Sequence, residues 1–293
     1  MYVGVHQINR VGMGRKALSI ERVRQAAHPL WVFISLWRYW ELVWQMSKRE
    51  VIGRYRGSMM GLLWSFFTPL LMLAIYTFVF GIALKVRWGE AAENQAGFAL
   101  ILFSGLIVHT LFAECVTRAP GLILSNVNYV KKVVFPLEIL PWVVMGAALF
   151  HAGVSFGVLL LCYVGLYHAF PWPIFALPVL LLPFVLLTMG VSWFLASFGV
   201  FVRDVGQTVG LLTTALLFLS PILYPVSVLP ESWRAYLFLN PLTFIVEQVH
   251  NVLFWGKLPD WQGLGLYYLC SQVVAWLGFL WFQKTHQGFA DVL

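Results

Sequence analysis

The stretch "GSMMGLLWSFFTPLLMLAIYTFVFGIAL" (57–84) contains no charged residue, and it decides the class of fold. A helix needs about 20 mostly apolar residues to cross the hydrocarbon core of a bilayer, and this stretch is longer. A charge at the membrane centre costs about 2.5–3.5 kcal/mol on insertion scales, so runs without charge locate membrane spans. The stretch therefore predicts a transmembrane helix.

The composition of the whole chain points the same way. Of its 293 residues, 60% are hydrophobic and only 11% are charged, whereas soluble domains carry about 25% charged residues. So few polar side chains cannot cover the surface of a soluble protein of this size. We therefore predict an all-α integral membrane protein.

Further charge-free runs predict five more spans. The longest, Ile139–Val202, has 64 residues, which is too many for one span. The segment "HAFPWP" (168–173) divides it, because its two prolines interrupt a helix. The six predicted spans are 57–84, 94–113, 139–166, 174–201, 205–230 and 261–283.

Residues 231–260, between the fifth and sixth spans, are predicted to form short re-entrant helices on the outer side. Their apolar runs, Ala235–Val246 and Gln248–Gly256, have 12 and 9 residues. At about 1.5 Å per residue, neither run crosses a bilayer as a helix. Asn240 and Pro241 mark the turn between the helices.

The basic residues are concentrated before the first span. Residues 1–57 hold ten Lys or Arg against three Glu, which equals the net charge of +7 of the entire chain. With six spans, 15 Lys or Arg lie on the side of the termini and 4 on the other side, which predicts cytoplasmic termini. A basic flank beside a span fits anionic lipid rather than nucleic acid. The predicted domains are a basic N-terminal segment (1–57), a transmembrane domain (58–285) and a cytoplasmic tail (286–293).

Residues 30–46 are predicted to form a helix that lies in the cytoplasmic membrane interface. Its polar residues are spaced three or four apart and so share one stripe of the helix; they are Ser35, Arg38, Glu41 and Gln45. Tryptophans occupy other positions and suit the depth of the lipid headgroups; they are Trp31, Trp37, Trp40 and Trp44. An amphipathic helix packed on protein is the alternative.

The sequence contains no motif for catalysis. It lacks a phosphate-binding glycine loop, a His-Glu-x-x-His pair and a Gly-x-Ser-x-Gly turn. Glu247 and His250 share a helix face, but a metal site needs more ligands. We therefore predict neither catalytic residues nor a metal site. Glu114, Arg118 and Glu138 lie near predicted span ends, where they can reach water or one another.

Four stretches, in order, carry a resemblance to a known family. They are "REVIGRYRGSMMGLLWSFFTPLLMLAIYTFVFG" (49–81), "NVNYVKKVVFPLEILPW" (126–142), "FVRDVGQ" (201–207) and "SPILYPVSVLPESWRAYLFLNPLTFIVE" (220–247). Together they make about residues 31–285 similar to the membrane subunit of ABC-2-type exporters. The resemblance is strongest to permeases that export O-antigen, capsule and teichoic-acid polysaccharides.

The resemblance implies a function as well as a fold. Such subunits work as homodimers with two cytosolic ATPase subunits, which bind ATP and magnesium, while the membrane subunit itself binds no cofactor. Their cargo is a polysaccharide on undecaprenyl diphosphate, and they lie in the bacterial inner membrane. An exporter of small hydrophobic molecules, and a membrane enzyme of lipid-linked glycan synthesis, remain alternatives.

Three arginines before the first span are candidates for contact with the diphosphate. Arg49, Arg54 and Arg56 would stand at the cytoplasmic mouth of the transport path. Guanidinium groups suit a diphosphate because they bind it in a bidentate manner. A positive-inside anchor explains the three arginines equally well.

The segment 118–130 is predicted to be a short amphipathic helix with Pro120 in its first turn. By resemblance it is the coupling helix that docks on the ATPase. For Lys131 and Lys132, the alternative is a membrane anchor at the start of the third span. The candidate coupling residues are Ile123, Ser125, Asn126, Asn128, Lys131 and Lys132.

Overall fold

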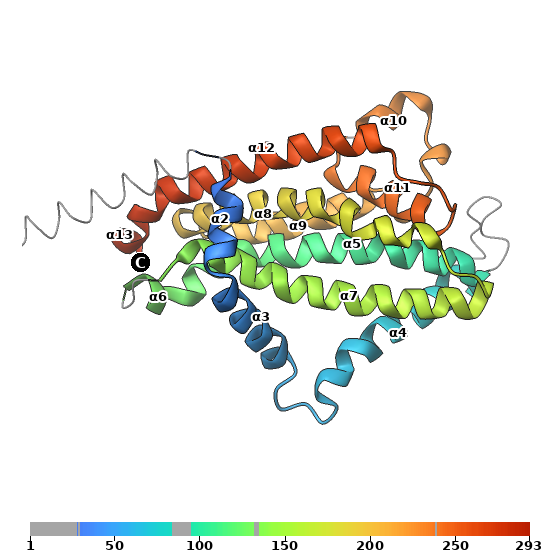
Figure 1. Cartoon of the computed structure of the whole chain (residues 1–293), viewed down its shortest axis with the longest axis horizontal. Helices are drawn as coiled ribbons and strands as arrows, with labels where there is room; N and C mark the ends of the chain where they lie inside the picture. Colours follow the sequence, from blue (N-terminus) through green and yellow to red (C-terminus); the bar gives the residue numbers. More distant parts are fainter. Residues whose placement is uncertain (1–27, 29, 84–94, 132–134, 238) are drawn as a thin grey trace, which may run out of the picture.

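The computed structural model describes residues 28, 30–83, 95–131, 135–237 and 239–293. These residues form helices joined by turns and loops, and none of them forms a β-strand. The predicted all-α class is therefore confirmed. The long helices run side by side along the longest axis of the molecule (Figure 1).

Five helical segments of the described chain are long and apolar enough to cross a membrane, so the chain is a multi-pass membrane protein. Each is built around one α-helix, and short 3-10 or π segments extend four of the five. These α-helices are α4 (Trp64–Tyr76), α5 (Gln95–Leu122), α7 (Leu140–Tyr167), α8 (Leu177–Phe201) and α12 (Trp261–Thr285), and all but α4 are long. The extensions are η1 (Gly61–Leu63), η2 (Thr77–Ala83), η5 (Leu137–Ile139), η6 (Trp172–Ala176) and η8 (His286–Gly288).

The predicted fifth span, 205–230, is not one helix. Helix α9 (Val205–Phe218) has 14 residues and ends before Pro221, so it is about 21 Å long and shorter than a bilayer core. Pro221 has no backbone N–H and cannot continue the helix. The six-span count is therefore not confirmed, and residues 219–230 instead form turns with a short helix, η7 (Val226–Val228).

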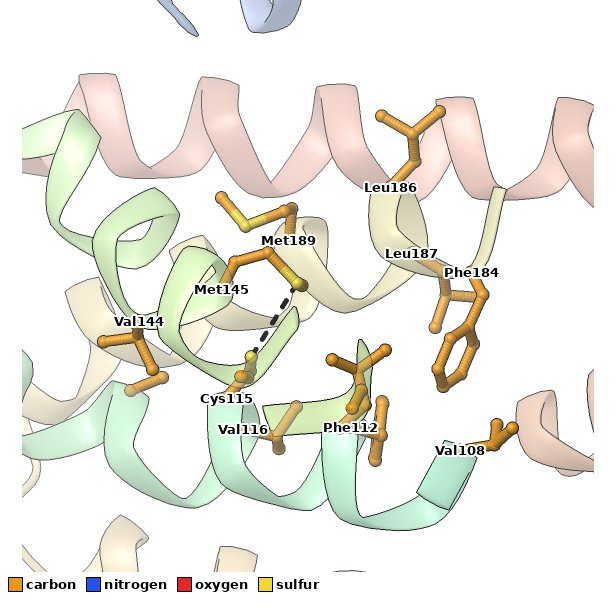
Figure 2. Close-up of a cluster of buried hydrophobic side chains, with 14 of the residues drawn as sticks. Val108, Phe112, Cys115, Val116, Val144, Met145, Phe184, Leu186, Leu187 and Met189 are labelled. Carbon is orange, nitrogen blue, oxygen red and sulfur yellow. Dashed lines mark hydrogen bonds between the residues drawn. The ribbon is translucent and has the colours of Figure 1, made fainter. Parts of the chain in front are cut away.

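Helix α5 is the centre of the bundle. In its most apolar stretch 78% of the residues are buried, against 11% in the segment that contains α4. Figure 2 shows side chains of α5, α7 and α8 meeting, with the sulfur atoms of Cys115 and Met145 4.0 Å apart. Phe112 of α5 and Phe184 of α8 pack with ring centroids 6.2 Å apart. Helix α4 instead presents most of its surface outward.

Helices α8 and α12 approach each other closely because glycines lie at their crossing. A Cβ atom on Gly278 would collide with the carbonyl oxygen of Gly190, and one on Gly190 would collide with the backbone of Val274. Close approach of helix backbones at small residues is the usual packing mode of membrane helices. Trp193 fills the neighbouring space, fully buried, and its indole donates to the carbonyl of Glu138 at 2.9 Å.

The predicted interface helix consists of two helices, α2 (Trp31–Arg38) and α3 (Trp40–Arg54), with a bend at Tyr39. The hydroxyl of Ser47 donates to the carbonyl of Val143 at 3.2 Å and so ties α3 to α7. The far end of α3 and the start of α4 diverge from the bundle (Figure 1). Gly57 and Gly61, at φ values of 86° and 51°, make the turn between them.

Two short helices follow α9 at the end of the bundle opposite α6 (Val127–Lys131) and the C-terminus (Figure 1). They are α10 (Glu231–Leu237) and α11 (Pro241–Leu253). As predicted, Asn240 and Pro241 form the turn between short helices, although the bounds of the helices differ from the predicted runs.

Candidate functional site

An ion-pair cluster joins the N-terminal helix α3 to the central helix α5. Arg54 pairs with Glu114, and Arg118 pairs with Glu50. The Nη1 atom of Arg118 also lies 3.6 Å from Oε1 of Glu114. The two arginines therefore share one carboxylate, whose side chain is only 13% exposed.

This cluster corrects the predicted end of the second span. Glu114 was expected to close a span at 94–113, but α5 continues to Leu122. A buried carboxylate is tolerated when cations neutralise it, and here they come from one turn further along α5 and from α3, 60 residues earlier. The expectation that Glu114 and Arg118 can reach each other is confirmed.

A tyrosine and a histidine extend the cluster toward α7. The hydroxyl of Tyr55 lies 3.4 Å from Nδ1 of His151. Burial raises the pKa of the Tyr55 hydroxyl, an effect that Arg54 opposes and Glu114 reinforces. Among the described residues, Nε2 of His151 is buried without a hydrogen-bond partner.

A groove of about 150 Å³ runs between α4, α5 and α7 beside this cluster. Its polar end holds Glu114 and His151, and the wall continues past Met72 and Ile107 to apolar side chains. The lining residues are Thr68, Pro69, Met72, Tyr76, Phe103, Leu106, Ile107, Thr110, Leu111, Glu114, Ala148, His151, Ala152 and Ser155. The groove thus combines a charged end with an apolar length.

The three candidate arginines differ in their surroundings. Arg54 is engaged by Glu114 and 40% exposed, whereas Arg49 on the same helix and Arg56 just after it are exposed. The structure brings Arg54 together with Arg118, a residue that the sequence analysis did not assign to a site.

The predicted coupling helix is shorter than expected. Pro120 lies inside α5 rather than in the first turn of a new helix, and only η4 (Leu124–Asn126) and α6 follow it. Membrane helices tolerate such a proline because neighbouring groups satisfy the freed backbone. Ile123 is fully buried in the main core, so it is not available to a partner.

The polar residues of this segment lie at the surface. Ser125, Asn128 and Lys131 are exposed. The amide of Asn126 donates to the carbonyl of Leu122 at 2.9 Å, which ends α5. Lys132 lies outside the described residues.

The C-terminal helix α13 (Phe289–Val292) packs beside α6. The ammonium group of Lys131 donates to the carbonyl of Leu293. Phe289 is fully buried and packs against Phe282, with ring centroids 5.5 Å apart. Lys131 is therefore held next to the end of the chain.

The polar stripe predicted for residues 30–46 is only partly present. Ser35 is buried and its hydroxyl donates to the carbonyl of Val32 at 3.0 Å, so it does not belong to an outer stripe. Arg38 and Glu41 are exposed. Trp37 is 87% exposed; Trp40 and Trp44 are also exposed, and Trp31 is partly buried.

The turn between α10 and α11 is held by one asparagine. The side-chain oxygen of Asn240 accepts from the backbone N–H of Leu242 at 2.9 Å and so caps α11. Its amide donates to the carbonyls of Leu216 and Leu219 and to the hydroxyl of Ser220, at 3.2, 3.1 and 2.8 Å. Asn240 therefore satisfies the broken end of α9 and the start of α11 together.

Comparison with known protein families identifies the family of this chain. Residues 41–254 match the family of ABC-2 type transporters. The chain belongs to the ABC-2 type transporter family. The match includes α3 from Glu41 onward, the first four of the five spanning segments, and α9, α10 and α11. Among the described helices, α2, α12, η8 and α13 lie beyond it.

Three relatives illustrate which proteins this ABC-2 chain is similar to in sequence. The O-antigen export system permease protein RfbA of Myxococcus xanthus is 28% identical over 260 residues, covering 88% of this chain and 97% of that protein. The protein of the same name from Klebsiella pneumoniae is 26% identical, covering 86% and 95%. The polysialic acid transport protein KpsM of Escherichia coli is 21% identical, covering 82% and 92%.

Sequence reasoning missed part of the cluster in this ABC-2 chain. From the sequence, Glu50 was counted only as one of the three Glu before the first span, and His151 was assigned to no site. His151 packs with Tyr55, and it also lines the groove. Only the pairing across 60 and 68 residues shows that α3 and α5 build one site.

Proposed function

We propose that this chain is the membrane subunit of an ATP-driven exporter of lipid-linked polysaccharide. The cargo would be O-antigen, with capsule as the second candidate, carried on undecaprenyl diphosphate from the cytoplasm across the bacterial inner membrane. The observation that carries the proposal is similarity along 95–97% of two O-antigen export permeases. The similarity to a polysialic acid transport protein favours capsule as the alternative.

The energy source would be a separate ATPase. We place its docking site at the exposed polar residues of the 124–131 segment, Ser125, Asn128 and Lys131, with Asn126 and Lys132 beside them. Ile123 would stiffen the junction from within the core. Because the segment follows directly on α5, a movement of the ATPase would be passed to the centre of the bundle.

The working unit would be a homodimer with two ATPase subunits. Large apolar side chains on α9 are exposed, with Leu211 at 74% and Leu212 at 57%. Such side chains fit lipid on one side of the helix and a second copy on the other. ATP and magnesium would be bound by the ATPase, and this chain would carry no cofactor.

The membrane topology would have six crossings with cytoplasmic termini. Helix α9 is too short to cross the membrane by itself. This crossing, the fifth along the chain, would therefore require residues 219–225 to complete the path to the outer side. Ile222 in this segment is fully buried, which fits non-helical backbone covered by protein at membrane depth. Helices α10 and α11 would then lie at the outer surface.

Deletion of the gene in the host bacterium tests the proposal. We expect loss of the surface polysaccharide together with accumulation of lipid-linked polymer in the cytoplasmic leaflet, and rescue by the intact gene. Loss of polymer without accumulation would instead indicate an enzyme of glycan synthesis. Unchanged surface polymer with altered efflux of a small apolar dye would indicate an exporter of hydrophobic molecules.

A further inference from the structure

The groove between α4, α5 and α7 has the chemical features of a lipid site. Its charged end holds Glu114 and His151, and its walls are lined by Met72, Leu106 and Ile107. Phe103 and Glu114 are 11 residues apart on α5, so the groove extends roughly 16 Å along the helix. Such a shape accommodates a headgroup at one end and a hydrocarbon chain along the rest.

The charges at this end favour an anion. Residues 48–56 and α5 together hold five Lys or Arg and only two carboxylates, those of Glu50 and Glu114. Both carboxylates are already bound to Arg54 or Arg118. Arg118 has one Nη1 atom that is buried without a hydrogen bond among the described residues. The two guanidinium groups are thus positioned to bind an anion that carries more charge than the Glu114 carboxylate that they share.

We propose that this groove binds the diphosphate end of a polyprenyl lipid. The phosphates would take the place of the Glu114 carboxylate between Arg54 and Arg118, and the isoprenoid chain would lie against Met72 and Ile107. Glu114 then acts as an internal competitor that keeps the arginines in position when the groove is empty. The identity of the lipid rests on the proposed function.

The size of the groove selects this lipid over a phospholipid. Pockets for drug-sized ligands measure about 300–1,000 Å³, and this groove measures about 150 Å³. It has room for a segment of one chain rather than for the paired acyl chains of a phospholipid. Two guanidinium groups that converge on one oxygen also match a diphosphate better than a single phosphodiester.

The test measures lipid binding to the purified complex of this chain with its ATPase. Native mass spectrometry is used with undecaprenyl diphosphate, undecaprenol and phosphatidylglycerol as probes. We expect undecaprenyl diphosphate to bind about tenfold more tightly than either other probe. Equal binding of phosphatidylglycerol, or of undecaprenol without phosphate, would overturn the proposal.

Two charge variants should shift the affinity in opposite directions. Arg118→Gln removes a ligand of the diphosphate and should weaken binding about tenfold. Glu114→Gln removes the competitor and should tighten binding. A merely structural cluster would lose binding in both variants, so weakening by Glu114→Gln contradicts the inference.

A matched pair on α4 keeps the test independent of the charged cluster. Met72 lines the groove and Leu71 does not, and both side chains are exposed on the same helix. Met72→Trp should fill the groove and weaken binding of undecaprenyl diphosphate, whereas Leu71→Trp should leave it unchanged. Equal affinity in the two variants would refute the site.

The failure of this inference can be told from failure of the proposed function. If Met72→Trp binds the lipid normally while deletion of the gene still blocks polymer export, the groove is not the site and the exporter stands. If deletion leaves surface polymer unchanged, the proposed function fails whatever the binding result.

Discussion

Glu114 shows how one residue can carry a charge inside a membrane helix. Its carboxylate is largely buried, and two guanidinium groups from different helices neutralise it. An unpaired charged carboxylate as buried as this one would destabilise the fold by several kcal/mol. The ion pairs therefore serve the insertion of α5 as well as any contact with cargo.

Removal of Arg54 should harm the protein more than removal of both partners. Arg54→Gln leaves Glu114 with Arg118 alone and should lower the free energy of unfolding by about 1 kcal/mol, because the pair is partly exposed. Arg54→Gln combined with Glu114→Gln should recover part of this loss. Thermal unfolding of the purified variants measures both effects.

Arg56→Gln is the matched control for this cycle, since Arg56 is exposed just beyond α3. We expect it to leave the unfolding temperature unchanged. A double variant that is no more stable than Arg54→Gln alone would show that the pair does not act as described.

Asn240 joins two helix ends and should be sensitive to small changes. Asn240→Ala removes both the cap of α11 and the donors to α9, and should cost about 1–3 kcal/mol. Asn240→Ser keeps a capping oxygen but loses the amide donors, so its stability should lie between alanine and wild type. Thermal unfolding orders the three proteins, and a serine variant as unstable as alanine would contradict the role of the cap.

At the scale of elements, the sequence predicts the helices well where charges or prolines mark the ends of an apolar run. The helices α7, α8 and α12 lie close to the predicted 139–166, 174–201 and 261–283, because charges, prolines or the HAFPWP break bound those runs. The expected end of the second span is wrong, since the partner of Glu114 lies far away in the sequence. Pro120 was wrongly placed at the start of a new helix for the same reason, because the residues that surround it in space are distant from it in the chain.

The predicted fifth span is not one continuous helix, for a different physical reason. Its 26 residues are free of charge, so hydropathy gave no sign of a break. Pro221 prevents the helix from continuing beyond Phe218, and Asn240 satisfies the carbonyls at the broken end. Only the long-range hydrogen bonds of Asn240 show how the end of α9 is satisfied without a continuing helix.

The crossing of α8 and α12 should tolerate no added methyl group at its glycines. Gly278→Ala would drive a Cβ atom into the backbone of Gly190 and should cost about 1–3 kcal/mol through overpacking. Gly265→Ala, on the same helix but facing open space, should be neutral or slightly stabilising. Unfolding temperatures of the two variants measure the difference, and equal values would refute the close packing.

The segment around α6 should act on the ATPase rather than on membrane insertion. Reversing the charge by Lys131→Glu, alone or with Lys132→Glu, should reduce co-purification of the ATPase and export of polymer by severalfold, because the exposed lysine faces the proposed docking side. The amount of protein in the membrane should change little. Western blots of membranes, pull-down of the ATPase and surface polymer measure the three quantities.

Lys284→Glu is the matched control for that variant, because Lys284 is an exposed lysine near the same end of the bundle, on α12. It should leave ATPase binding unchanged. If Lys131→Glu lowers membrane level and export equally, Lys131 is an anchor and not part of the coupling surface.

At the scale of the whole molecule, α5 connects every proposed activity. Its C-terminal end continues into η4 and α6, its Glu114 and Arg118 meet α3, and its other face packs against α7, α8 and α9. A displacement at α6 would therefore move the ion-pair cluster and the groove together. This arrangement gives a physical route from ATP hydrolysis to the proposed lipid site.

The central claim is that the chain moves lipid-linked polysaccharide with energy from ATP. The most direct measurement is transport in proteoliposomes that contain this chain, its ATPase and lipid-linked polymer from the host. We predict that polymer crosses the bilayer only with ATP and not with an ATPase variant that binds but does not hydrolyse it. Transport without ATP, or none in the complete system with active ATPase, would contradict the account.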